Sequence, residues 1–104
     1  MDNKLELVLT ACEDKIGKDI KTVKLDENKA LADYFVIVTG NTPNHTQSIA
    51  DEVEKVCEEA GYEILGKEGY REGHWILLDI SDIILHVFTP EERDYYDLER
   101  LWTY

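Results

Sequence analysis

The segment HWILLDISDIILHVF, residues 74–88, decides the fold of this chain. Two apolar runs flank DISD (79–82), and Asp and Ser are common turn residues. Apolar runs joined by such a short turn predict an antiparallel β-hairpin. Because side chains alternate between the two faces of a strand, Trp75 lies on the same face as Asp79. The carboxylate indicates that this face is not entirely core, and it leaves open whether Trp75 faces a partner or lies buried beneath a helix.

Three further segments predict the remaining strands and their connection. YFVIV (34–38) is a continuous apolar run of β-branched and aromatic residues, which is typical of a central strand covered on both faces. DIKTVKLD (19–26) alternates polar and apolar residues, as a strand with one exposed face does. YEIL (62–65) predicts a short strand, and GKEGYREG (66–73) predicts a loop. With the hairpin, these segments give five strands.

Three segments show helical periodicity. The first has Gly17 as its expected end. The second begins with Thr42 as N-cap and Pro43 at the first helical position, where a missing N–H costs nothing, and it ends at Gly61. The third begins at Pro90. The expected buried stripes are Leu5, Val8, Leu9, Cys12 and Ile16 in the first helix, Ile49, Val53, Val56, Cys57 and Ala60 in the second, and Tyr95, Leu98 and Trp102 in the third.

The element order is therefore α-β-β-α-β-β-β-α, which predicts a single α/β domain over residues 1–104. Its mixed five-stranded sheet carries flanking helices. The strand–helix–strand unit in the middle implies a right-handed crossover and at least one parallel pair, whereas the hairpin is antiparallel.

The formal net charge of −12 narrows the choice of partner. Phosphate backbones are neutralised by Lys and Arg, so direct nucleic-acid binding is not expected. A basic protein partner suits the charge, although the charge alone is equally consistent with a role in solubility. Cys12 and Cys57 are too few for a secreted disulfide framework and are expected to be buried free thiols. With no apolar run long enough to span a membrane and no signal-like N-terminus, a cytoplasmic protein is expected.

The sequence lacks the motifs that usually mark an enzyme active site. His45, His74 and His86 lack metal-ligand spacing, and a structural role is favoured even though the last two could face each other across the hairpin. No glycine-rich phosphate loop occurs, and TGN (39–41) before a helix is a weak signal for an anion site. Metal-dependent nucleotidyl transfer needs two carboxylates on one face of a strand, whereas Asp79 and Asp82 are three residues apart across a turn. We expect no catalytic residue, no cofactor and no metal.

A binding surface is the better hypothesis for the remaining polar and aromatic residues. Tyr96 lies off the predicted stripe of the last helix, close to two glutamates, and Trp75 shares its face with an aspartate. An aromatic patch rimmed by acids is typical of a surface for a basic protein. The proposed contact residues are Trp75, Asp79, Asp82, His86, Glu92, Tyr96 and Glu99.

The chain closely resembles the ribosomal silencing factor family, also called Iojap-like proteins. The matching segments are ADYFVIVTGNT (32–42), HTQSIADEVE (45–54) and EGHWILLDISDIILHVFTPEERDYYDLERLW (72–102), with DIKTVKLD (19–26) before them. Together they cover nearly the whole chain. Relatives commonly carry Ser where this chain has Thr42, and Gly where it has Ser81, so the hairpin turn here is open to a different type.

The resemblance implies an α/β domain related in fold to nucleotidyltransferases but without their catalytic carboxylates. It further implies binding to a basic ribosomal protein on the joining face of the large ribosomal subunit. Such binding blocks association with the small subunit sterically and represses translation when nutrients are scarce. Members form homodimers when free. Two alternatives stay open from the sequence: a nucleotide-binding or nucleotidyltransferase-type enzyme, and an acidic adaptor for a non-ribosomal basic protein.

Overall fold

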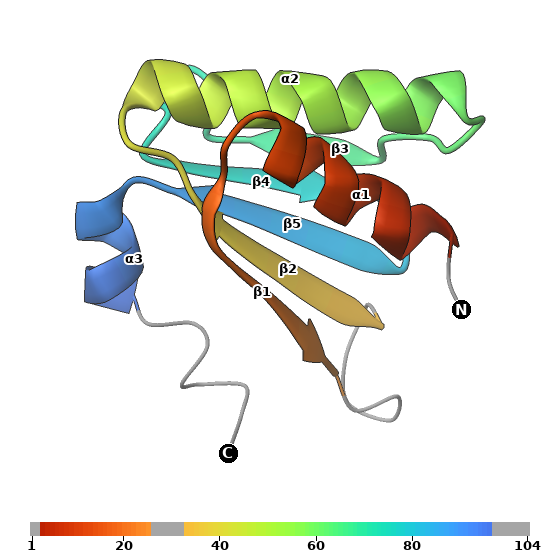
Figure 1. The fold of residues 1–104 in the computed structure, drawn as a ribbon, viewed down its shortest axis with the longest axis horizontal. Helices are drawn as coiled ribbons and strands as arrows, with labels where there is room; N and C mark the ends of the chain where they lie inside the picture. Colours follow the sequence, from red (N-terminus) through yellow and green to blue (C-terminus); the bar gives the residue numbers. More distant parts are fainter. Residues whose placement is uncertain (1–2, 26–32, 97–104) are drawn as a thin grey trace.

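The computed structural model of the protein describes residues 3–25 and 33–96, with side chains as far as Arg93. Within these ranges the chain forms three helices and five strands, whose arrangement Figure 1 shows. The elements are α1 (Asn3–Asp14), β1 (Lys18–Lys24), β2 (Tyr34–Thr39), α2 (Pro43–Glu59), β3 (Gly66–Glu68), β4 (Trp75–Asp79), β5 (Ile83–Phe88) and α3 (Pro90–Tyr96). No helix in the described part of the chain is long and apolar enough to cross a membrane.

The strands form one mixed sheet in the order β1-β2-β5-β4-β3. β2 and β5 are parallel, and the other three pairs are antiparallel. This arrangement confirms the predicted α/β class, the antiparallel hairpin and the presence of a parallel pair. The parallel pair joins β2 to β5, because β2 and β3, the two strands of the strand–helix–strand unit, are not neighbours in the sheet. β5 is the central strand, with β2 and β4 on either side of it, and both parallel partners are rich in apolar residues.

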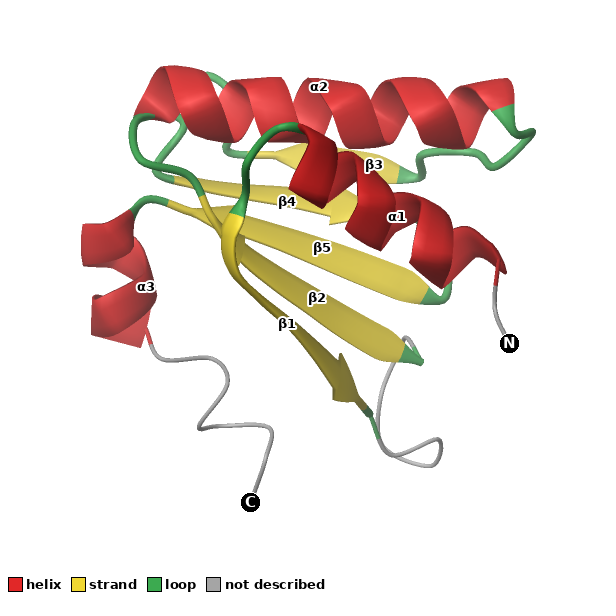
Figure 2. Cartoon of the chain, in the orientation of Figure 1, coloured by secondary structure: helices red, strands yellow, loops and turns green. Residues whose placement is uncertain are grey.

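Helices α1 and α2 pack against each other and against one face of the sheet, which we call the inner face (Figure 2). Their apolar stripes and every second residue of the central strands form one buried cluster. Cys12 and Cys57 belong to it as buried free thiols, which confirms that prediction. The inner-face strand residues of this cluster are Val36, Val38, Ile76, Leu78, Ile83, Leu85 and Val87.

The first helix ends differently from its prediction. Ile16, expected in the buried stripe, is 73% exposed and has a φ of 60°, a left-handed conformation that glycine adopts more easily. Its N–H donates to Glu13 O at 2.9 Å and that of Gly17 to Cys12 O at 2.8 Å, the two bonds of a Schellman motif. Gly17 is needed one position later, because a Cβ there would lie 2.6 Å from Val38 Cγ2. The glycine therefore serves close packing, and the isoleucine takes the strained position.

Two other predictions were wrong in detail. The third strand covers residues 66–68, whereas the apolar pattern placed it at 62–65. Leu65 N–H donates to Asp79 O at 2.7 Å, so pairing with β4 begins only at the end of the predicted segment 62–65. Ile64 packs on the core without pairing. Ala60, which was expected in the buried stripe of the second helix, is instead exposed at the C-cap of α2. Thr42 is confirmed as the N-cap of α2, with Oγ1 accepting from His45 N–H at 3.2 Å.

The stripe predicted for the last helix cannot be placed. Leu98 and Trp102 lie outside the described residues, and the structure describes the backbone of Tyr95 but not its side chain. Helix α3 itself begins at Pro90, as predicted, and lies where β5 ends, apart from α1 and α2 (Figure 2). Arg93 Nη1 donates to Thr39 Oγ1 at 2.7 Å, which ties α3 to the end of β2.

Candidate functional site

The face of the sheet opposite α1 and α2, which we call the outer face, carries a group of packed rings. Trp75 comes from β4, Phe35 from β2, and His86 and Phe88 from β5. The ring centroids of Phe35 and His86 are 4.7 Å apart with an edge-to-face angle of 67°, and those of Trp75 and Phe88 are 5.0 Å apart. Such separations are typical of favourable aromatic pairs. We call these four residues the aromatic cluster.

The aromatic cluster is buried at its centre and partly open at its sides. Phe88 is 1% exposed and His86 4% exposed, while Phe35 and Trp75 are only half-buried. Trp75 thus lies on the face away from α1 and α2, so it is not buried beneath either helix. Other half-buried residues on the outer face are Leu77, Asp79 and Ile84.

A hydrogen bond joins the two nitrogen-bearing rings of the aromatic cluster. Trp75 Nε1 donates to His86 Nδ1 at 3.1 Å. Because an indole N–H can only donate, His86 Nδ1 must be the acceptor and the ring proton must be on Nε2. Burial lowers the pKa of His86 from its ordinary 6.5 to about 4, so the imidazole is neutral at physiological pH. His86 Nε2 is buried and has no hydrogen-bond partner in the described part of the chain.

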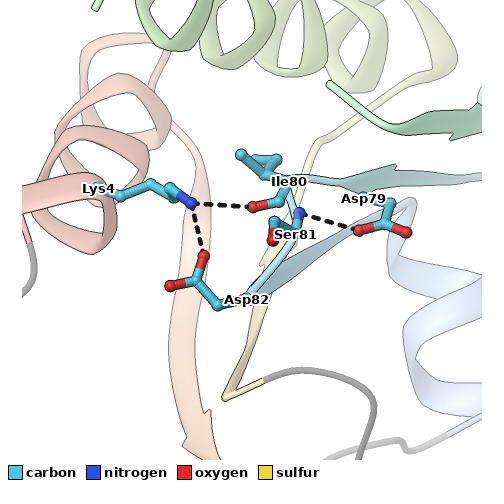
Figure 3. Close-up of polar contacts among 5 residues, drawn as sticks. All are labelled: Lys4, Asp79, Ile80, Ser81 and Asp82. Carbon is cyan, nitrogen blue, oxygen red and sulfur yellow. Dashed lines mark hydrogen bonds and ion pairs between the residues drawn. The ribbon is translucent and has the colours of Figure 1, made fainter. Parts of the chain in front are cut away.

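The two aspartates of the hairpin turn have separate partners (Figure 3). Asp79 Oδ1 accepts from Ser81 N–H at 3.0 Å, and Ser81 has a φ of 69°. Asp82 Oδ1 lies 2.6 Å from Lys4 Nζ, which also donates to Ile80 O at 3.3 Å. Asp79 thus closes the turn as a turn-forming residue does, and Asp82 ties the turn to α1.

The structure therefore gathers some of the predicted contact residues and separates others. Trp75, Asp79 and His86 share the outer face, although His86 is buried and was expected on an exposed side. Asp82 is directed toward α1. Glu92 is half-buried on α3, the side chain of Tyr96 is not described, and Glu99 lies outside the described residues. As contact residues of a partner, all seven remain predictions from the sequence.

Apolar residues of the outer face that were not proposed as contacts from the sequence include Phe35, Leu77, Ile84 and Phe88. Leu77 could have been found, because it alternates with Trp75 and Asp79 along one strand. Phe35 and Ile84 lie in continuous apolar runs that show no alternation. Only the pairing of β2 with β5, in which Phe35 lies opposite Ile84, reveals that they share this face.

The start of α2, where a phosphate would meet a helix N-terminus, is packed against segment 69–73. Thr46 Oγ1 lies 2.6 Å from Gly73 O, and Gln47 Nε2 donates to Tyr70 O at 2.8 Å, so the segment 69–73 is held against the start of α2. A Cβ on Gly73 would lie 2.8 Å from Pro43 Cβ. The described residues contain no cluster of three or more His, Cys, Asp or Glu side chains that could hold a metal ion. A nucleotide site thus gains no support from the start of α2.

Comparison with known proteins gives a consistent family. The profile described as "Ribosomal silencing factor during starvation" matches residues 1–104. The chain is 40% identical over 98 residues to the ribosomal silencing factor RsfS of Halalkalibacterium halodurans, covering 94% of this chain and 84% of that relative. It is 39% identical over 98 residues to RsfS of Bacillus subtilis, covering 94% and 83%. A crystal structure of a Chromobacterium violaceum protein superposes with a TM-score of 0.94 at 36% identity, covering 98% of this chain and 87% of that one.

Proposed function

The chain belongs to the ribosomal silencing factor family, and on this premise we propose that it represses translation by binding the large ribosomal subunit. It binds a basic ribosomal protein on the joining face and so prevents association with the small subunit when nutrients are scarce. The observation that carries the proposal is the family match along the whole chain. The half-buried outer face supplies a surface on which such binding can occur.

The outer face has the composition of a protein-binding surface. Aromatic residues are enriched in the centres of interfaces, and Trp75 and Phe35 are half-buried there beside Leu77 and Ile84. The net charge of −12 favours a basic partner, since complementary charge speeds association and selects against wrong partners. The contact residues proposed from the sequence are kept: Trp75, Asp79, Asp82, His86, Glu92, Tyr96 and Glu99.

The proposed mechanism requires binding alone. A standard protein–protein interface buries about 800 Å² on each partner, which is ample to occupy a place that the small subunit needs. No catalytic group, cofactor or metal takes part. The free protein is proposed to be a cytoplasmic homodimer.

Co-sedimentation tests this function directly. The purified protein is mixed with isolated large subunits, isolated small subunits and joined ribosomes, at low and at moderate salt. We expect it to pellet with large subunits, to be displaced partly by salt, and to compete with small-subunit joining, because acidic side chains meet basic ones. Failure to pellet with large subunits would contradict the proposal. Pull-down with a non-ribosomal basic protein would then favour an acidic adaptor.

A thermal-shift arm separates the proposal from the nucleotide-binding alternative. A ligand that binds the native state raises the melting temperature. We expect nucleoside triphosphates with Mg²⁺ to leave the melting temperature unchanged, because segment 69–73 packs against the start of α2. A saturable rise would favour a nucleotide-binding protein.

A further inference from the structure

His86 is a polar residue in an apolar place. It is 4% exposed, and its ring packs edge-on against Phe35 and stacks near Phe88 at an interplanar angle of 8°. Its Nε2 has no hydrogen-bond partner among the described residues, and burying an unsatisfied polar group destabilises the folded state. An apolar side chain of similar size would avoid this penalty. The imidazole is therefore poorly explained by stability alone.

The one polar interaction of the imidazole that the structure shows is with Trp75. The indole N–H of this half-buried residue points at His86 Nδ1 from 3.1 Å, while its ring lies 5.0 Å from Phe88. The two contacts fix different features of the indole. Packing against Phe88 sets the plane of the ring, and the hydrogen bond sets which edge of the ring turns inward.

Orientation of Trp75 matters because a side chain that must be ordered on binding weakens the affinity. An indole already fixed in the free protein loses less conformational entropy when a partner covers it. The neutral imidazole suits this role, since it offers an acceptor on Nδ1 whereas a protonated ring offers none.

We propose that His86 is a positioning residue: by accepting the indole hydrogen bond it holds Trp75 in the orientation in which the outer face binds its partner, without touching the partner itself. This inference rests on the proposed binding to the large subunit. It assigns to His86 an indirect role in the proposed contact surface.

Three substitutions separate positioning from structure. His86→Leu has similar volume and removes both nitrogens, so the indole loses its acceptor while the unsatisfied Nε2 also disappears. His86→Asn places an amide oxygen near the position of Nδ1 and restores an acceptor. His74→Asn is the matched control, because His74 is exposed on the loop before β4. Melting temperature and affinity for isolated large subunits are measured for each variant.

We expect His86→Leu to melt at or above the wild-type temperature but to bind large subunits about tenfold more weakly, the effect of losing one well-placed hydrogen bond. His86→Asn should recover most of the affinity, and His74→Asn should bind as the wild type does. If the role of His86 were purely structural, His86→Leu would instead lower the melting temperature and leave the affinity of the folded protein unchanged. Wild-type-like binding by His86→Leu would overturn the proposal.

A measurement on the unmodified protein covers the case in which His86→Leu fails to fold. The chain has two tryptophans, so an NMR spectrum shows two indole N–H signals, and Trp75→Phe identifies that of Trp75. We expect this signal to exchange with solvent more than tenfold more slowly than free indole, and the ¹⁵N shifts of His86 to show the proton on Nε2. Exchange at the free rate, or the other tautomer, would overturn the proposal. Failure of wild-type protein to bind large subunits would instead refute the proposed function and leave the hydrogen bond intact.

Discussion

The two faces of the sheet use the same strands for different purposes. On the inner face, Ile76, Leu78 and Leu85 are 0% exposed beneath α1 and α2. On the outer face, their immediate neighbours Trp75 and Leu77 are half-buried, and the strands also carry a carboxylate and an imidazole. Since neighbouring residues of a strand point to opposite faces, one step along the chain changes what a side chain does. Substitutions one residue apart should therefore separate folding from binding.

The largest effect is expected on the inner face. Leu85→Ala should lower the free energy of unfolding by about 3–4 kcal/mol, because the fully buried side chain leaves a cavity that its neighbours cannot fill. Leu77→Ala, half-buried on the outer face, removes the same atoms and should cost only about 1 kcal/mol. Urea unfolding of both variants measures the difference. Equal losses would mean that the two faces are equally well packed and that folding and binding are not divided between them.

The next effect concerns the imidazole of the outer face and appears with pH. The pKa of His86 is about 4 in the folded protein, below its ordinary 6.5, so acid protonates the unfolded chain first. His86 therefore does not reduce the free energy of unfolding above pH 6.5. As the pH falls from 6.5 toward 4, this free energy decreases by roughly 3 kcal/mol in total. Urea unfolding at pH 7 and pH 4.5 measures the loss.

His86→Leu is the control for this titration, because carboxylates also take up protons in the same range. The difference between wild type and variant isolates the imidazole, and the variant should lose clearly less stability on acidification. Parallel curves for the two proteins would show that folding does not lower the pKa of His86. The imidazole would then be hydrated in the folded protein, and the outer face would be less tightly packed around it.

A binding effect of intermediate size is expected at Trp75. Trp75→Ala should weaken binding to large subunits by about 2 kcal/mol or more, as substitution of a central interface aromatic does. Ile76→Val, one residue along and on the inner face, should lower the free energy of unfolding by about 1 kcal/mol and leave the affinity unchanged. Co-sedimentation combined with urea unfolding gives both quantities. If Trp75→Ala unfolds while its folded fraction binds normally, Trp75 belongs to the core and the binding surface lies elsewhere.

Much of the difference between the two faces of the sheet could be predicted from the hairpin alone. The alternation along residues 75–79 places Trp75 and Asp79 together, and the burial of β4 follows that alternation. The face covered by helices could not be predicted, because β2 and the first three residues of β5 show no alternation of polar and apolar residues and their partners are distant in sequence. The buried state of His86 was missed for the same reason: its neighbour Phe35 reaches it only through the parallel pair. Local pattern determines which residues share a face, whereas strand order determines what covers them.

The smallest effect is expected where the helix layer of the inner face meets the hairpin turn. Lys4 of α1 pairs with Asp82, and the exposed fractions of their side chains are 14% and 35%. Because the Asp82 side chain remains about one-third exposed, solvent screens the pair, which should contribute only about 0.5 kcal/mol. Because each residue can make other contacts, the pair is measured by a double-mutant cycle with Lys4→Met and Asp82→Asn, from urea unfolding at low salt and at 0.5 M salt. We expect the coupling to shrink at the higher salt, since screening weakens exposed ion pairs. A coupling of zero at both salts would mean that the backbone alone holds the turn, and Asp82 would then be the stronger candidate for a direct contact with a basic partner.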